Sequence, residues 1–303
     1  MHTTAKPHRW VIDEPDIPFE FTVLYEDERI IVIDKPHFLP TTPRGMWYRS
    51  TALIRLRERY DEPQITPAHR LDRDTAGVVV FVRDPLARGR YQMLFQEHRT
   101  TKTYECVAPA RPITRPRFGT IERLDAPRVF PLRRRSRIVK DRGILQAYEE
   151  PGLVNAETVI ELGVDGGCLG DRFEDNRSGN GRSANSRSAD DRSGVCHTGG
   201  RLEHDRFAVD RANDWPMGDR SLVTACPMRA YTLRPRTGKT HQLRVHMNSL
   251  GLPIKGDPMY PTIIDRAYDD FLNPLQLVAR TLEFTDPYTG ENRRFVSQAP
   301  LDV

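Results

Sequence analysis

Residues 67–82, with the sequence PAHRLDRDTAGVVVFV, decide the fold. The last six residues form a short continuous run that is dominated by β-branched side chains. Such a run predicts a strand that is buried on both faces, as the central strand of a sheet is. The ten residues before it form a polar loop. A loop that a central strand supports is held firmly, so its side chains can be aimed at a ligand.

The flanking segments indicate further strands with a few short helices between them. Residues 21–25 and 29–34 are β-rich runs around the acidic turn 26–28, which predicts a hairpin. Strands are also expected at 102–108, 157–162 and 228–233. Ser50, Asp84 and Thr240 are suitable N-caps for helices that begin just after them.

Composition excludes several classes of protein. The 303 residues carry 46 Lys or Arg and 42 Asp or Glu, a formal net charge of +4, and 38% of them are hydrophobic. No run approaches the roughly 18 apolar residues of a membrane span, and residues 1–18 lack the apolar core of a secretory signal. The four cysteines are scattered without a CxxC pair, which argues against a disulfide framework or a zinc site. A cytoplasmic protein is therefore expected.

Two segments are expected to lie outside the packed core. Residues 1–20 are polar and contain prolines, so they are interpreted as an N-terminal tail. Residues 163–218 are rich in Gly, Ser, Asn, Asp and Arg, and four similar pentads follow one another at 176–195. Because the pentads offer no inward apolar residue, a disordered insertion is predicted. An RNA-binding arm is the alternative, although 11 acidic residues face nine arginines between 165 and 220.

A basic segment precedes that insertion. Residues 111–143 contain 11 Arg or Lys and three acidic residues, a net charge of +8. The densest part holds Arg133, Arg134, Arg135 and Arg137. Concentrated positive charge of this kind is typical of a surface that contacts a phosphate backbone. A solvated charged loop is the plainer interpretation.

The polar loop of the deciding stretch contains the first candidate for chemistry. Asp72 stands between Arg70 and Arg73, whose positive charge favours the ionised form of its carboxyl group. An ionised and oriented carboxylate serves as a nucleophile or as a base. The alternative is that Asp72 or Asp74 only bridges arginines or caps a turn.

Two later segments add further candidates. Lys102 and Tyr104 share one face of an expected strand, where they suit a phosphate and a base respectively, although such a pair is common on strands. In the segment 234–246, RPRTGKTHQLRVH, Arg244 lies at the margin of an apolar helical stripe and is able to reach a carboxylate. His241 and His246 are five residues apart, a spacing that makes a shared metal site unfavourable.

Together these motifs resemble the RluA family of RNA pseudouridine synthases. The segments that carry the resemblance are HRLDRDTAG at 69–77, KTY at 102–104, TGKTHQLRVH at 237–246 and LGLPIKGDPMY at 250–260. The resemblance covers about residues 21–298. It implies a single α+β catalytic domain at 21–303, with a mixed and mainly antiparallel sheet, flanking helices and a central RNA cleft. Ala76 and Pro261 depart from the family's usual TSG and YG.

The resemblance also implies roles for particular residues. Asp72 matches the essential aspartate, Tyr104 the tyrosine that stacks on the target base, and Arg244 the arginine that pairs with that aspartate. No cofactor or metal is implied. The basic and imidazole side chains in these motifs and in the basic segment are expected to bind RNA: His69, Arg70, Lys102, Arg133, Arg134, Arg135, Arg137, Lys239 and His241.

The expected activity is therefore the isomerisation of uridine to pseudouridine in structured ribosomal or transfer RNA. Too few residues precede the first core strand for an S4-type RNA-binding domain, and a monomer is expected. Two alternatives stay open. The protein could be a non-catalytic RNA-binding protein of the same fold, or a hydrolase that uses Asp72 and Asp74 as an acid and base pair.

Overall fold

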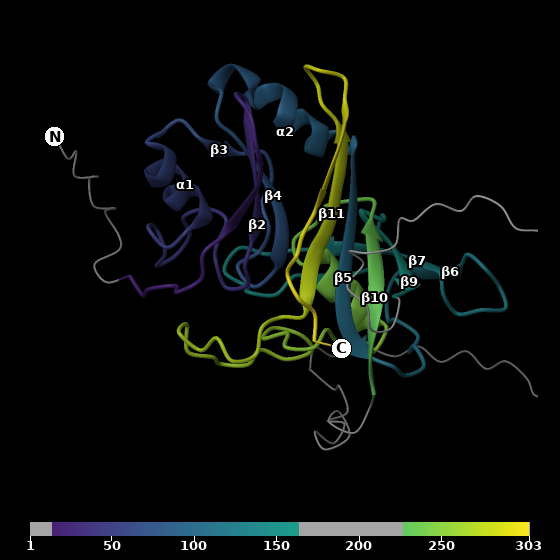
Figure 1. Cartoon of the computed structure of the whole chain (residues 1–303). Helices are drawn as coiled ribbons and strands as arrows, with labels where there is room; N and C mark the ends of the chain where they lie inside the picture. The colour runs from purple at the N-terminus through teal and green to yellow at the C-terminus, as the bar shows by residue number, and fades with distance from the viewer. Residues whose placement is uncertain (1–13, 164–226, 303) are drawn as a thin grey trace, which may run out of the picture.

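The computed structural model describes residues 14–163 and 227–302 (Figure 1). The pentads and all of the predicted insertion except Gly163 lie outside the described residues, so its disorder stays a prediction. Within the described ranges, no helix is long and apolar enough to span a bilayer.

One sheet organises the described chain. Its strands follow the order β1 (Thr22–Glu26), β2 (Ile30–Lys35), β4 (Ala76–Val82), β11 (Leu277–Thr285), β5 (Thr100–Pro109), β10 (Met228–Pro235), β9 (Ala156–Leu162), β7 (Leu132–Val139) and β6 (Thr120–Arg123). Three short strands pair with members of this path: β3 (Thr66–Pro67) with β4, β8 (Tyr148–Glu150) with β7, and β12 (Asn292–Val296) with β11. The β4–β11 pair is parallel and the other pairs are antiparallel, which confirms the predicted mixed and mainly antiparallel α+β fold.

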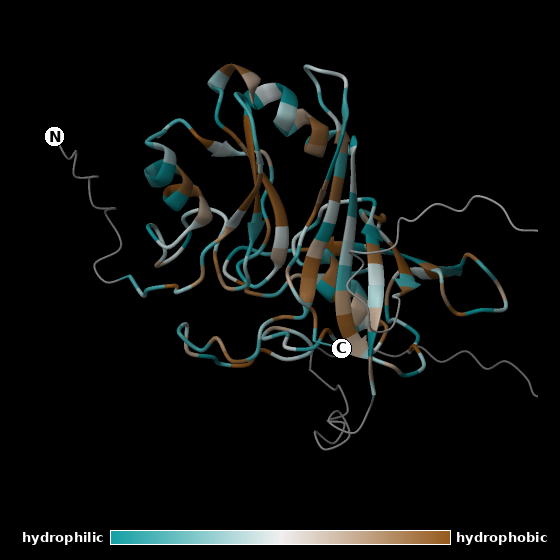
Figure 2. Cartoon of the chain, in the orientation of Figure 1, coloured by the Kyte–Doolittle hydropathy of each residue, from teal (hydrophilic) through white to brown (hydrophobic). Residues whose placement is uncertain are grey.

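The predicted central strand is β4, and every one of its residues is buried. Its side chains alternate between two separate cores, as the period of two requires. Val78, Val80 and Val82 pack with helix α2 (Arg88–Gln96), whereas Val79 and Phe81 pack with helix α1 (Ala52–Tyr60) on the opposite face. Figure 2 shows this apolar strand in brown between more polar helices. Burial of each such side chain contributes roughly 1.5–3 kcal/mol, so β4 holds both layers together.

A third core lies under the other half of the sheet. Helix α3 (Gln242–Ser249) contributes Leu243 and Met247, which pack with residues of β5, β7, β9 and β10. Gly251 follows the C-cap residue of this helix, Leu250, and its φ of +73° suits that position. Gly251 N donates to Asn248 O (2.9 Å) and Leu252 N donates to Met247 O (3.0 Å), the two bonds of a Schellman motif.

The helix N-termini confirm one predicted cap and correct two. Asp84 Oδ1 accepts from Leu86 N (2.9 Å), as predicted, and caps the short 3-10 helix η1 (Pro85–Ala87), which leads into α2. The cap of α1 is Thr51 rather than Ser50, because Thr51 Oγ1 accepts from Ile54 N (3.4 Å). Thr240 is exposed and does not cap α3. His241 occupies the N-cap position there in a left-handed conformation.

The N-terminal boundary also needs correction. Residues 14–20 belong to the folded domain and not to a tail. Ile17 is buried in the core beside α1, and Phe19 stacks on Phe38 with ring centroids 5.9 Å apart. The Glu14 carboxylate accepts hydrogen bonds from the backbone of residues 48–50. Residues 14–20 are thus attached to the domain by a few apolar side chains and by the Glu14 carboxylate.

Candidate active site

Asp72 lies in the loop between β3 and β4, and the backbone of this loop is fixed by bonds to the segment after β2. Thr41 is buried, and its Oγ1 donates to Leu71 O (2.8 Å) and accepts from Leu71 N (3.1 Å). On the other side, Thr75 N donates to Asp72 O (3.2 Å). The Asp72 side chain itself stays 41% exposed. A rigid backbone therefore presents an open carboxylate.

Lys35 and His37 hold the same loop from the end of β2. Lys35 is fully buried, and its Nζ donates to three backbone carbonyl oxygens, those of Pro36, Leu39 and Arg73. His37 Nδ1 lies 2.7 Å from Asp74 O. Burial lowers the pKa of Lys35 to about 7, although the charges of Asp74 and Asp72 oppose this shift. The loop that carries Asp72 is thus held by side chains from a segment 30 or more residues earlier in the chain.

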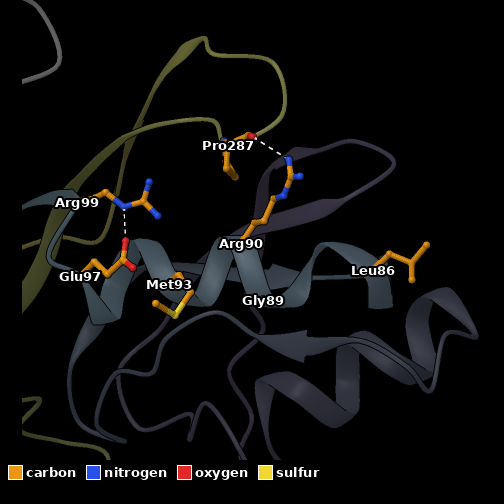
Figure 3. A pocket seen from close by; sticks show the side chains of 7 residues that line it. All are labelled: Leu86, Gly89, Arg90, Met93, Glu97, Arg99 and Pro287. Carbon is orange, nitrogen blue, oxygen red and sulfur yellow. Dashed lines mark hydrogen bonds and ion pairs between the residues drawn. The ribbon is translucent and has the colours of Figure 1, made fainter.

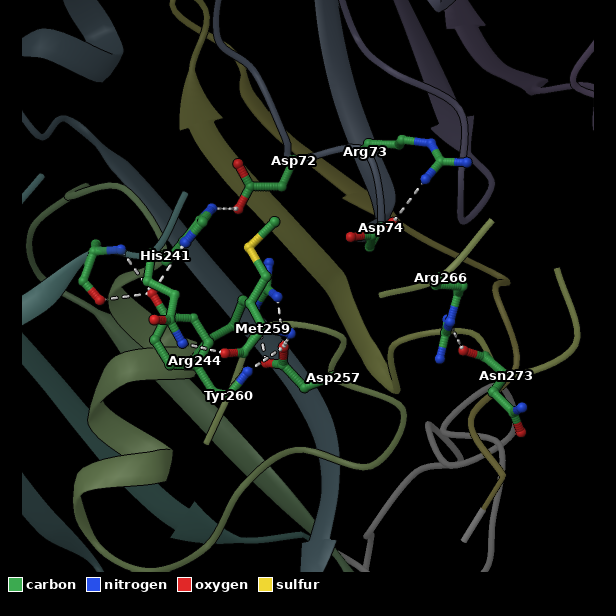
Figure 4. Close-up of polar contacts among 12 residues, drawn as sticks. Asp72, Arg73, Asp74, His241, Arg244, Asp257, Met259, Tyr260, Arg266 and Asn273 are labelled. Carbon is green, nitrogen blue, oxygen red and sulfur yellow. Dashed lines mark hydrogen bonds and ion pairs between the residues drawn. The ribbon is translucent and has the colours of Figure 1, made fainter. Parts of the chain in front are cut away.

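Arg73 points away from Asp72, as Figure 4 shows. Its guanidinium donates to Phe38 O (3.2 Å) and Tyr268 O (2.7 Å) and lies over the Trp47 ring, 4.5 Å from the centroid. The prediction that Arg73 flanks the carboxylate is therefore wrong. Neighbouring side chains on this loop point in different directions, which adjacency in sequence does not reveal.

Tyr104 approaches the same carboxylate from β5. Its partly buried ring packs against the core under α3. Burial raises the pKa of the Tyr104 hydroxyl well above its usual range, and the negative charge of Asp72 raises it further. Two motifs that stand 32 positions apart in sequence are therefore electrostatically coupled.

Arg244 reaches the site from α3, but its hydrogen-bonded partner is Asp257 and not Asp72. Arg244 Nε lies 2.8 Å and Nη2 lies 2.5 Å from the two Asp257 oxygens, and both side chains are 1% exposed. Burial lowers the pKa of Arg244, but the hydrogen bond and charge of Asp257 and the charges of Asp72 and Asp74 outweigh it and raise the pKa. Sequence reasoning found Arg244 and missed Asp257, although the GDPMY motif was visible. The predicted direct pair with Asp72 is corrected to an interaction through space.

Among the described residues, His241 is the one that forms an ion-pair contact with the Asp72 carboxylate. Its Nε2 stands 3.9 Å from Asp72 Oδ2, and its Nδ1 stands 3.1 Å from the hydroxyl of Tyr260 (Figure 4). The Tyr260 ring lies 5.3 Å from the Arg244 guanidinium carbon, so the three side chains form one cluster. The sequence assigned His241 to RNA, and nothing in the local pattern signalled this contact.

Two other predicted RNA contacts, His69 and Lys102, lie beside Phe95. His69 Nε2 accepts from Val80 N (3.2 Å), and its ring stacks on Phe95 with centroids 4.2 Å apart. Burial, with a smaller effect of the Lys102 charge, lowers the pKa of His69 to about 3, so this side chain offers no positive charge near neutral pH. Lys102 Nζ lies 6.0 Å from the Phe95 ring centroid. His69 therefore has a packing role, and Lys102 is the cation beside it.

The predicted arginine cluster is a strand with two different faces. Arg134 is fully buried on β7 and donates to both Glu149 oxygens at 2.7 Å, so it is not available to a phosphate. On the partly exposed face, Arg133, Arg135 and Arg137 pair with the carboxylates of Glu122, Glu157 and Glu150. Three of these four glutamates lie outside the basic segment 111–143. The local excess of positive charge is therefore smaller on the folded surface than in the sequence.

A surface depression of about 530 Å³ lies away from these residues. Figure 3 shows it beside α2 and the turn after β11, lined by Leu86, Gly89, Arg90, Met93, Glu97, Arg99 and Pro287. None of the predicted site residues lines it. Among the described residues, no group of three or more His, Cys, Asp or Glu side chains is arranged to hold a metal ion.

Comparison with known structures and sequences identifies the class of protein. Human RNA pseudouridylate synthase domain containing 4 has the same fold, with a TM-score of 0.51 over 92% of this chain and 88% of that one, at 18% identity. The sheet thus has the pseudouridine synthase fold. The family described as RNA pseudouridylate synthase matches residues 29–249. The chain belongs to this family.

Its relatives include proteins of the RluA type. An uncharacterized RNA pseudouridine synthase of Synechocystis is 37% identical over 98 residues, 32% of this chain and 33% of that protein. The dual-specificity RNA pseudouridine synthase RluA of Vibrio vulnificus is 26% identical over 269 residues, 88% of this chain and 78% of that protein. RNA pseudouridine synthase 1 of Oryza sativa is 25% identical over 291 residues, with shares of 92% and 72%. The match spans about one third of the Synechocystis relative and about three quarters of the other two.

Proposed function

We propose that this protein isomerises uridine to pseudouridine in structured RNA, with Asp72 as its catalytic carboxylate. The observation that carries the proposal is the convergence of separate motifs of the family on Asp72. The charge of Asp72 acts on Tyr104 and on Arg244, and its carboxylate lies 3.9 Å from His241. Each of these residues stands in a motif that matches the RluA type.

The residue types suit this reaction. The enzyme must break the bond between ribose C1′ and uracil N1 and join C1′ to C5, so the base must leave the helical stack at a cost of a few kcal/mol. Stacking on the Tyr104 ring recovers about 1–3 kcal/mol. Because the pKa of Tyr104 is raised, the side chain is a neutral phenol in the free enzyme. Asp72 is the exposed carboxylate that acts as base or nucleophile.

Arg70 and Lys239 are the best candidates for contact with the RNA backbone. Both are exposed, and within residues 14–163 and 227–302 neither pairs with a carboxylate. Lys102, which lies beside the Phe95 ring, is a third candidate. Arg133, Arg135 and Arg137 are partly exposed, and they bind RNA phosphates only where these displace the glutamate partners. We no longer propose Arg134 and His69 as RNA contacts, because Arg134 is buried against Glu149 and His69 is neutral.

The proposed substrate is a ribosomal or transfer RNA. Transfer RNA is named for one relative, tRNA pseudouridine synthase C of Vibrio parahaemolyticus, which is 23% identical over 292 residues. We further propose that the protein is a monomer and that it acts in the cytoplasm. The scattered cysteines and the buried free thiol of Cys106 support a reducing compartment. Mapping pseudouridines across total RNA of a deletion strain identifies the target nucleotide. Gel filtration of the purified chain tests the monomer.

Tritium release from RNA that contains 5-tritiated uridine tests the activity. Wild-type protein is expected to release tritium, and Asp72→Asn is expected to lose at least about 1000-fold in rate with little change in RNA affinity, because only the charge of the carboxylate is removed. Asp74→Asn is the matched control and is expected to retain most of the rate.

Three results contradict the proposal in distinguishable ways. Free uracil among the products would identify a hydrolase. RNA binding without release of tritium from any cellular RNA would identify a non-catalytic binding protein. An equal loss of tritium-release rate in Asp72→Asn and Asp74→Asn would contradict the role of Asp72 as the catalytic carboxylate.

A further inference from the structure

The backbone of His241 adopts a conformation that residues other than glycine rarely take. Its φ is +55° and its ψ is +16°, in the left-handed region. This conformation costs on the order of 1–3 kcal/mol and persists only where surrounding contacts fix it. His241 O nevertheless accepts from Val245 N (2.9 Å), so the residue starts α3 in this strained state. Strain of this kind gathers at functional sites.

Hydrogen bonds to Tyr260 fix the His241 ring and its tautomer. The Tyr260 hydroxyl lies 2.7 Å from Ala147 O, and Ala147 N donates to it at 2.9 Å. A phenol has one hydrogen, and we assign it to the shorter bond, to the carbonyl that has no hydrogen of its own. His241 Nδ1, 3.1 Å from the same hydroxyl, must then donate. A neutral ring with hydrogen on Nδ1 has a free electron pair on Nε2.

That free electron pair faces Asp72. Nε2 lies 3.9 Å from Asp72 Oδ2, and the His241 side chain is 9% exposed. Burial lowers the pKa of His241 and dominates, while the charges of Asp72 and Asp257 raise it and those of Arg244 and Lys140 lower it. The ring is therefore neutral near pH 7. An ionised carboxylate has no hydrogen to give to Nε2, whereas a protonated one does.

We propose that His241 is a positioning residue for Asp72, whose unprotonated Nε2 accepts a hydrogen bond from the Asp72 carboxyl group while that group holds a substrate proton. The inference rests on the proposed function and on its base mechanism. The Asp72 carboxylate takes the proton from ribose C2′, the C–H electron pair forms the C1′–C2′ double bond, and the C1′–N1 pair leaves with uracil. Asp72 then returns the proton to C2′, which takes up the double-bond pair and leaves C1′ short of electrons. An electron pair of the uracil anion forms the C5–C1′ bond. The C5 proton passes to water while its electron pair restores the C5–C6 double bond, and N1 takes up a proton from water.

Two substitutions separate this role from a structural one. Asn tolerates a positive φ, and its amide N–H replaces the Nδ1 donor to Tyr260, but it places nothing near Asp72. Gln extends far enough to place its carbonyl oxygen where Nε2 stands. We expect His241→Asn to lower kcat by about 10- to 100-fold with KM for RNA within twofold, and His241→Gln to recover most of that loss.

Uridine deuterated at C2′ provides a second readout. Because His241→Asn slows proton transfer to Asp72, its kcat is expected to show a larger deuterium isotope effect than that of the wild-type enzyme. Thr240→Ala, at an exposed neighbour with no assigned role, is the matched control and is expected to leave kcat and KM unchanged. Thermal unfolding of each variant checks that the helix start is intact.

Three results would overturn the proposed role of His241. Full kcat in His241→Asn overturns the inference, as does a loss that appears in KM alone, which would return His241 to RNA contact. Equal loss in His241→Asn and His241→Gln, without an isotope effect, also overturns it. If the wild-type enzyme itself releases no tritium from RNA, the proposed function fails before this inference is reached.

Discussion

At the scale of single residues, the site depends on a buried charge that is paired with an opposite charge. Arg244 lies in the interior because Asp257 takes both of its hydrogen bonds. Asp257 Oδ1 also accepts from Met259 N (2.8 Å) and Tyr260 N (3.1 Å), so one carboxylate fixes the arginine and the tyrosine beside it. The local pattern was enough to find Arg244. Its partner was missed because 13 positions separate the two and no helical or strand period links them.

Replacement of Asp257 tests this pair. Asp257→Asn leaves the buried Arg244 guanidinium without its counter-charge, and we expect the free energy of unfolding to fall by about 3–5 kcal/mol. Urea denaturation measures the change. Asp270→Asn is the matched control, because Asp270 pairs with Arg266 at 3.7 Å on a more exposed surface, and its loss is expected to cost less than about 1 kcal/mol. Equal effects of the two changes would contradict the assigned importance of the buried pair.

At the scale of elements, α3 is held to the sheet by a buried polar network as well as by its apolar stripe. His246 is fully buried, and its Nε2 lies 3.1 Å from Ser136 Oγ of β7 while its Nδ1 lies 2.9 Å from Thr158 Oγ1 of β9. Gln242 Nε2 donates to the same Thr158 hydroxyl at 3.0 Å. His246 therefore joins α3 to two strands of the sheet by hydrogen bonds within the core.

This network makes stability depend on pH. Burial lowers the pKa of His246 to about 3, with a smaller effect of the Arg134 charge, whereas an unfolded histidine has a pKa near 6.5. Between these values the unfolded chain binds more protons, so stability is complete above pH 6.5 and is lost as the pH falls toward 3. We expect His246 to contribute a slope of about 1 kcal/mol per pH unit below pH 6.

Chemical denaturation at pH 7.5, 6.0 and 5.0 measures that slope. His246→Gln retains hydrogen-bonding atoms but does not titrate, so its stability is expected to be lower at pH 7.5 and to fall less steeply toward pH 5.0. Identical slopes for the two proteins would show that His246 is not kept neutral by the fold.

At the scale of the whole molecule, the site lies where two parts of the sheet join. Asp72 comes from the part that contains β1, β2 and β4, whereas Tyr104, His241 and Arg244 come from the part beyond β11. The short parallel pairing of β4 with β11 connects them, with Ala279 opposite Gly77. Gly77 has a φ of +121°, and a Cβ there would lie 2.3 Å from Ala279 O. Glycine is therefore required at the junction.

A methyl group at this junction is expected to be costly. Gly77→Ala should lower the free energy of unfolding by more than about 3 kcal/mol and reduce tritium release in any folded fraction, because both the backbone angle and the contact with β11 are incompatible with a side chain. Gly89→Ala is the control, since a Cβ at that helical position meets nothing within 4 Å, and it should stabilise by roughly 0.5 kcal/mol. Thermal unfolding compares the two. A tolerated Gly77→Ala would contradict the close approach of the strands.

The sequence by itself determined the elements and the motifs. The β-branched run of β4, the hairpin before it and the Asp84 cap follow from contacts within a few residues, and the motifs around Asp72, Tyr104 and Arg244 are continuous in the chain. Only the tertiary structure decided which side chains meet. The burial of Arg134 against Glu149, the Arg244–Asp257 pair and the approach of His241 to Asp72 join distant segments. Such contacts depend on strand order and register, which no local pattern encodes.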